Sequence, residues 1–101
     1  MLDQSYKNFE LLILDNCSSD NTQEIIKSFV DPRIKQIRHL ANIGFIANWL
    51  YGLNWAKDKF YSVLGDDDYH HSNFIESRVN IFKKYHNSWA VFSDHEISDE
   101  L

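Results

Sequence analysis

Short apolar runs alternate along the chain with longer segments in which apolar residues recur at helical spacing. The short runs predict strands, because buried parallel strands are apolar on both faces. They are Glu10–Asp15, Ile34–Arg38, Phe60–Leu64 and Trp89–Asp94. The longer segments predict three helices, which run from Ser19 or Asp20 to Asp31-Pro32, from Phe45 to about Lys57, and from Asn73 to about Tyr85. This order predicts an α/β fold with a mostly parallel sheet and flanking helices.

The predicted helix ends rest on local chemistry. Ser19 or Asp20 can cap the first helix by accepting a hydrogen bond from its first turn. Pro32 ends that helix, because proline disfavours the helical conformation in the residue before it. Ser72 or Asn73 can cap the last helix in the same way.

Acidic residues follow three of the predicted strands. In a parallel sheet, ligands bind beyond the carboxyl ends of the strands. We therefore expect the acids to gather at one edge of the sheet. They are Asp15, Asp66, Asp67, Asp68 and Asp94.

The run Gly65-Asp66-Asp67-Asp68 favours a metal site. Three adjacent carboxylates repel one another unless water or a cation separates them. Mg²⁺ and Mn²⁺ take oxygen ligands, and one or two carboxylates with substrate phosphates are a common set. The alternative is an exposed acidic turn that only ends a strand.

Several amide-bearing positions fit either a turn or a nucleotide pocket. Asp15-Asn16 follows a strand, where such residues commonly form turns. Asn42 and Gly44 form a turn signal, and Asn48 lies on an otherwise apolar helix. His70-His71 follows the acidic run, but adjacent histidines on an extended segment point to opposite faces.

Composition and charge narrow the function further. The 101 residues supply one domain, and a net charge of −5 argues against binding nucleic acid or anionic lipid. The single cysteine, Cys17, excludes an internal disulfide framework. No apolar run reaches the roughly 18 residues that span a bilayer.

The motifs together resemble one known family, the inverting family-2 nucleotide-sugar glycosyltransferases of the GT-A fold. The resemblance covers almost the whole chain and rests on the order and spacing of the motifs. The matching stretches are Gln4–Glu10, Leu14–Thr22, Asp31–Ile34, Asn42–Gly44 with Asn48, Leu64–Asp68 as a metal and diphosphate (DXD) motif, and Val91–Asp94.

The resemblance implies a Rossmann-like fold and a role for each matching residue. Asp15 and Asn16 would contact the base and ribose of a nucleotide-sugar, and Asp66 would lie near the ribose. Asp67 would hold Mg²⁺ or Mn²⁺ against the diphosphate, with Asp68 as support. Asn42, Gly44 and Asn48 would shape the nucleotide pocket. Asn16 departs from the family's frequent aspartate, so UDP-, dTDP- and GDP-sugars all stay open as donors.

The resemblance also implies what surrounds this chain. Residues 1–101 would be a partial donor-binding domain, truncated at both ends, because the family's opening strand and its catalytic base match nothing here. The acceptor would be a saccharide or a lipid-linked saccharide. The location would be the cytoplasm, or the inner face of the membrane as a peripheral protein.

Two other interpretations remain open. One is a nucleotidyltransferase-like enzyme with a Mg²⁺–phosphate site, although no glycine- and lysine-rich phosphate loop is present. The other is an inactive truncated module that forms a homodimer through an exposed sheet surface.

Overall fold

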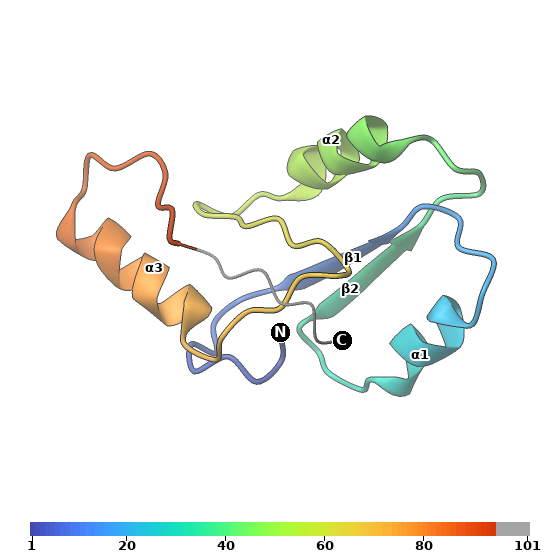
Figure 1. Ribbon diagram of the computed structural model, residues 1–101, viewed down its shortest axis with the longest axis horizontal. Helices are drawn as coiled ribbons and strands as arrows, with labels where there is room; N and C mark the ends of the chain where they lie inside the picture. The colour runs from blue at the N-terminus through green and yellow to red at the C-terminus, as the bar shows by residue number, and fades with distance from the viewer. Residues whose placement is uncertain (95–101) are drawn as a thin grey trace. The chain divides into compact units, whose positions relative to one another are not determined.

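The computed structural model describes residues 1–94 and divides the chain into two compact units. One unit runs from Asn8 to Asp68, and the other combines residues 1–7 with the chain from Tyr69 onward. Within residues 1–94, the regular elements follow one another in the order strand, helix, strand, helix, helix (Figure 1). They are β1 (Leu11–Asp15), α1 (Thr22–Ser28), β2 (Ile34–Arg38), α2 (Phe45–Trp55) and α3 (Phe74–Lys84).

The two strands of the Asn8–Asp68 unit pair in parallel, as the sequence predicts. Their register places Leu11 opposite Ile34 and Asp15 opposite Arg38. Hydrogen bonds close both ends of the ladder: the Leu11 N–H donates to the Arg33 carbonyl at 2.8 Å, and the His39 N–H donates to the Asp15 carbonyl at 2.9 Å. The α/β class of the fold is therefore confirmed.

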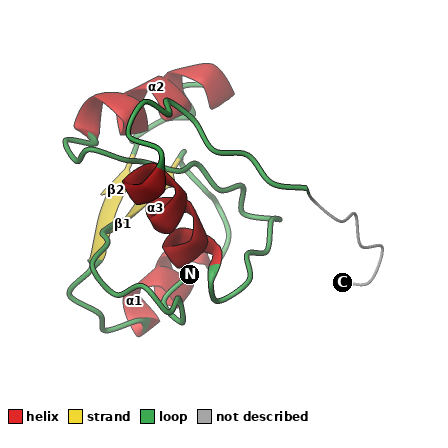
Figure 2. Cartoon of the chain, turned by 90° about the vertical axis from the view of Figure 1, so that its left-hand side faces the viewer, coloured by secondary structure: helices red, strands yellow, loops and turns green. Residues whose placement is uncertain are grey.

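The helices of this unit cover opposite faces of the sheet, because successive side chains of a strand alternate between its faces. Leu14 faces α2, where a β-carbon added to Gly52 would lie 2.5 Å from the Leu14 Cδ1 atom. Asp15 faces α1, and its carboxylate accepts a hydrogen bond from the Gln23 side chain. Figure 2 shows α1 and α2 on the two sides of the strands.

The first helix differs from its prediction at both ends. It ends at Ser28, before Pro32, because Phe29 already has extended backbone angles (φ −87°, ψ 116°). Asn21 is its N-cap residue but makes no capping bond through its side chain. The hydrogen bond predicted for Asp20 does form, because its carboxylate accepts from the N–H of Thr22, the first residue of α1, at 3.0 Å.

Two of the predicted strands do not form. Residues 60–64 and 89–94 have no regular structure, and within the described chain neither joins the sheet of β1 and β2. A strand is stabilised by a paired neighbour and by burial of its side chains. These segments have neither, since Tyr61 is 68% exposed and Trp89 is 98% exposed. The prediction of four strands in the sheet is therefore wrong, since the sheet of the described residues has two strands.

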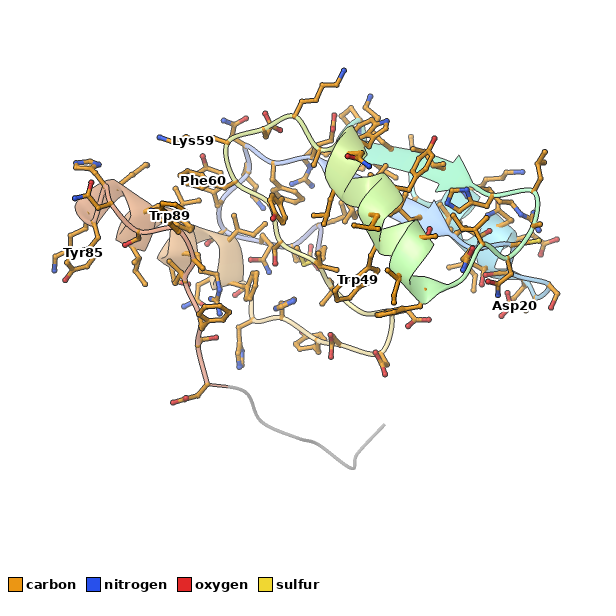
Figure 3. The ribbon with its side chains drawn as sticks, turned by 90° about the horizontal axis from the view of Figure 1, so that it is seen from above. Asp20, Trp49, Lys59, Phe60, Tyr85 and Trp89 are labelled. Carbon is orange, nitrogen blue, oxygen red and sulfur yellow. The ribbon has the colours of Figure 1, made fainter. Side chains whose placement is uncertain are left out.

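Apolar side chains remain widely accessible. Among residues 1–94 none of the hydrophobic side chains is fully buried, and even the apolar residues of the two strands are only half-buried. Figure 3 shows Trp49 on α2 and Phe60 on the segment that follows it; both side chains are exposed. No helix in this range is both long and apolar enough to cross a membrane.

In the second unit, the N-terminal segment caps α3. Gln4 is only 2% exposed. Its Nε2 donates to the His71 carbonyl at 2.6 Å, and its Oε1 accepts from the Ile75 N–H at 3.0 Å. The predicted cap was wrong, because the Asn73 side chain makes no capping bond. Gln4 instead satisfies the first-turn N–H that a local cap normally serves.

We expect replacement of Gln4 by alanine to destabilise the start of α3 by about 1–2 kcal/mol, which is typical for loss of a cap. The reason is that the Ile75 N–H and the His71 carbonyl both lose their partner. Hydrogen exchange of the Ile75 amide measures the effect. Gln36→Ala is the matched control, because the Gln36 amide donates to Gln23 in the other unit. Unchanged exchange of Ile75 in Gln4→Ala would contradict the assignment of the cap.

Candidate functional site

The loops that follow β1 and β2 are joined by two asparagine side chains. The Asn16 Nδ2 donates to the Asn42 Oδ1 at 2.9 Å, and the Asn16 Oδ1 accepts from the Ile43 N–H at 2.9 Å. The Asn42 Oδ1 also accepts from the Gly44 N–H at 2.9 Å. We call these two side chains and the two backbone N–H groups the amide clamp. The structure thus brings together three of the predicted nucleotide-site residues at the carboxyl edge of the sheet.

The backbone of these loops adopts conformations that few residues accept. Gly44 has φ 84° as the N-cap residue of α2, and a β-carbon there would meet no atom within 4 Å. Its requirement for glycine is therefore one of backbone angle rather than of space. Cys17 has φ 69°, which is unusual for a residue with a side chain. Its thiol donates to the Leu40 carbonyl at 3.6 Å, which links the same two loops.

Asn48 lies one turn into α2 and is engaged by a histidine. Its Oδ1 is 3.0 Å from the His39 Nε2, and the His39 ring makes an edge contact with Tyr51. His39 directly follows β2, so this contact fixes α2 to the same edge of the sheet. No role for His39 is predicted from the sequence.

Asp15 is buried at the end of β1, with 4% of its surface exposed. Its Oδ1 accepts from the Ser18 N–H at 2.8 Å, and its Oδ2 accepts from the Gln23 amide and lies 3.4 Å from the Arg38 Nε. Hydrogen bonding from Ser18 is the main cause that lowers the pKa of Asp15, against the opposing effect of burial. Gln23 and the charge of Arg38 lower the pKa further.

Asp15 therefore supports the loop that presents Asn16. The Arg38 guanidinium also donates to the Ser18 carbonyl at 2.8 Å, so both ends of this short turn are held. Sequence reasoning did not identify Gln23 and Arg38. The register could have suggested Arg38, since it lies directly opposite Asp15. A contact between Asp15 and a nucleotide stays a prediction.

The acidic run forms a tight turn. The Asp68 N–H donates to the Gly65 carbonyl at 3.3 Å, and the Gly65 N–H donates to the Asp68 carboxylate at 3.1 Å. A β-carbon at Gly65 would lie 2.8 Å from the Asp67 Oδ1 and 3.0 Å from the Asp68 Oδ2. Both carboxylates thus fold back toward one point above Gly65, and all three acids are exposed.

The convergence of two carboxylate oxygens fits a hard divalent cation that completes its shell with phosphate and water. It does not make a full protein cage: in the described part of the chain, no three His, Cys, Asp or Glu side chains are grouped to hold a metal. The three atoms nearest to a β-carbon at Gly65 belong to Asp67 and Asp68 rather than to Asp66.

The gathering of acids from three strands was predicted wrongly. Only Asp15 ends a strand, since residues 60–64 and 89–94 are not part of the sheet. The Asp66–Asp68 turn belongs to the Asn8–Asp68 unit, whereas Asp94 belongs to the other unit. The sheet itself therefore positions Asp15 and the amide clamp, but not the remaining acids.

Comparison with known proteins identifies the family. The family model of glycosyl transferase family 2 matches residues 1–100. An uncharacterized glycosyltransferase of Rickettsia typhi is 31% identical over 98% of this chain and 31% of its own length. The Escherichia coli UDP-Glc:alpha-D-GlcNAc-diphosphoundecaprenol beta-1,3-glucosyltransferase WfgD is 32% identical over 96% of this chain and 38% of its own length.

An uncharacterized glycosyltransferase of Haemophilus influenzae is 32% identical over 84% of this chain and 35% of its own length. The chain thus spans less than two fifths of the length of each of these three relatives. No solved structure matches it.

Proposed function

We propose, from the premise that the chain belongs to glycosyl transferase family 2, that it forms the donor-binding part of a sugar-transferring enzyme. The enzyme would move a sugar from a nucleotide-diphosphate donor to an acceptor hydroxyl with inversion. One observation carries the proposal: the Asp67 and Asp68 carboxylates converge above Gly65 within the stretch Leu64–Asp68 that resembles the family's diphosphate motif.

In this proposal, Asp67 and Asp68 hold Mg²⁺ or Mn²⁺ at the diphosphate. The bound ion would supply positive charge to the leaving diphosphate. Gly65 leaves space for the two carboxylates in this arrangement, since a β-carbon there would lie 2.8 Å from the Asp67 Oδ1 and would displace it. Inversion also needs a base that deprotonates the acceptor hydroxyl. We assign that role to no residue of this chain.

The nucleotide itself would lie over the amide clamp and its neighbours. We propose contacts from residues that the family resemblance singles out, which are Asn16, Asn42, Gly44, Asn48 and Asp66. Asp15, also singled out, would act by holding the loop that presents Asn16. The printed name of WfgD gives UDP-glucose as its donor and a lipid-linked diphosphate saccharide as its acceptor. This supports a UDP-sugar donor and a lipid-linked saccharide acceptor for the present chain. We further propose, as the family resemblance implies, a place in the cytoplasm or, as a peripheral protein, at the inner face of the membrane.

The proposal is tested by calorimetric titration of UDP, dTDP and GDP with and without Mn²⁺. We expect at least one of them to bind, and to bind more tightly with Mn²⁺, because the ion joins the carboxylates to the diphosphate. Absence of binding in every titration would overturn the proposal. On the full-length protein, release of pyrophosphate from a nucleoside triphosphate, rather than of a nucleoside diphosphate from a nucleotide-sugar, would favour the nucleotidyltransferase alternative.

A free sheet edge favours self-association as a second property. The two hydrogen bonds at the ends of the β1–β2 ladder use the N–H of Leu11 and the carbonyl of Asp15, so these two residues bond toward β2. In a parallel pair the residues that bond to one neighbour alternate with residues that point away from it. The backbone N–H and C=O groups of Leu12 and Leu14 therefore point away from β2, and no strand of the described chain pairs with them. A second copy of β1 in antiparallel orientation could bond to these groups.

Light scattering of the 101-residue chain tests this dimer, which we expect to have twice the mass of the chain. Leu12→Pro removes only an outward N–H, so it should abolish the dimer and keep the circular dichroism of the fold. Ile13→Pro is the matched control, because its N–H points toward β2 and its loss should disrupt the sheet itself. A strictly monomeric native chain would contradict this proposal.

A further inference from the structure

The amide clamp fixes the orientation of both of its side chains. An asparagine oxygen and nitrogen are often assigned only from their hydrogen-bond partners. Here each oxygen faces a backbone N–H, which can only donate: Ile43 N–H for Asn16, and Gly44 N–H for Asn42. The bond from the Asn16 Nδ2 to the Asn42 Oδ1 agrees with this orientation.

The groups of the clamp that are left for a ligand are therefore mainly donors. The Asn42 Oδ1 already accepts two hydrogen bonds, which uses both of its lone pairs. Its Nδ2 keeps two N–H groups, and the Asn16 Nδ2 keeps one, with no further partner in the described part of the chain. Asn42 is exposed, so its N–H groups can reach a ligand.

The neighbouring acid cannot supply an acceptor at this edge. The side chain of Asp15 has no exposed surface, and both of its oxygens are engaged by Ser18, Gln23 and Arg38. A ligand above the ends of β1 and β2 thus meets amide donors rather than a carboxylate. Nucleobases differ at this point: uracil has a keto oxygen at position 4, an acceptor, where cytosine has an amino group, a donor.

We propose that the Asn42 amide is a specificity-determining group that donates a hydrogen bond to a keto oxygen of the donor's nucleobase and so selects uracil over cytosine. This inference rests on the proposed function, since it assumes that a nucleotide binds at this edge. An amino group in place of the keto oxygen would set two donors against each other, which leaves both without a partner.

Competitive titration of UDP and CDP in the presence of Mn²⁺ tests the inference. We expect the native chain to prefer UDP by about tenfold, the value of one well-placed hydrogen bond. Asn42→Asp keeps an oxygen for Gly44 and Asn16 but replaces the outward N–H groups by an acceptor, so it should remove or reverse the preference. Asn54→Asp, which adds the same charge at an exposed amide on α2, should retain the preference.

A second measurement does not depend on any variant being folded. The analogue 4-thio-UDP carries sulfur, a weaker acceptor, at position 4 and should bind the native chain less tightly than UDP. Equal affinity for UDP, CDP and the analogue would overturn this inference and leave the proposed function intact. A UDP preference that survives in folded Asn42→Asp would do the same. No binding of UDP or CDP with Mn²⁺ would overturn this inference, and the proposed function would fall with it only if dTDP and GDP also failed to bind.

Discussion

Replacement of Asp67 by asparagine is expected to abolish the Mn²⁺-dependent part of UDP binding, with a loss of affinity on the order of a hundredfold. Asparagine keeps an oxygen near the point above Gly65 where the Asp67 and Asp68 carboxylates meet. It lacks the negative charge with which a carboxylate attracts a divalent cation more strongly than a neutral amide oxygen does. Calorimetric titration of UDP at saturating Mn²⁺ measures the loss.

The same experiment includes two controls. Asp58→Asn removes a charge from another exposed acid of the same unit and should leave the affinity for UDP unchanged. Titration of Asp67→Asn without Mn²⁺ should match the native chain without Mn²⁺, because only the metal-dependent part is lost. Full affinity of Asp67→Asn for UDP with Mn²⁺ would show that the turn is an ordinary acidic surface.

Replacement of Asp15 by alanine is expected to destabilise the Asn8–Asp68 unit by about 3 kcal/mol, because hydrogen bonds to a buried charged group are among the stronger ones. The Ser18 N–H and the Gln23 amide would lose their acceptor, and Arg38 would lose its ion pair. Asp15→Asn should cost less, since it keeps an oxygen for the Ser18 N–H. Urea denaturation at pH 7 measures both values, and equal stability of Asp15→Ala and the native chain would contradict the role of this carboxylate.

The same carboxylate gives the unit a defined pH dependence. The pKa of Asp15 in the folded chain is lowered from its ordinary value of 3.8, chiefly by hydrogen bonding from Ser18. Its stabilising contribution is thus complete above pH 3.8 and is lost as the pH falls through the lower, folded pKa. Asp20, whose pKa is lowered mainly by hydrogen bonding from Thr22, acts in the same direction. Asp15→Asn should weaken this acid destabilisation, seen as a smaller difference in urea midpoint between neutral and acid pH.

The sequence correctly predicts the three helices and the two strands that pair with each other. β1 and β2 are predicted correctly because both are short apolar runs. Each strand also supplies the backbone groups to which the other strand bonds. The three helices were found within a few residues of their predicted ends, except that α1 stops before Pro32. Residues 60–64 have the same apolar pattern as β1 but pair with no strand of the described chain, and a pattern of residues does not reveal which segments will pair.

The part of the candidate site that depends on turn-forming residues could be predicted from the sequence. Asn16, Asn42 and Gly44 are turn residues, and parallel strands bring their loops to one edge. The burial of Asp15 was not predictable, because it depends on Gln23 from α1 and on Arg38 from β2. Nothing local indicates the cap of α3 either, since Gln4 lies 71 residues before the N–H that it accepts from.

That separation has a consequence for the order in which the chain folds during synthesis. Gln4 leaves the ribosome about 4 to 14 seconds before Ile75 at ordinary rates of translation, because 71 residues separate them. The Asn8–Asp68 unit, whose strands and helices are complete by then, can form while the N-terminal segment still has no partner. Gln4 is therefore made before its partner and fixed after it, and closing this long loop is the late step in forming the start of α3.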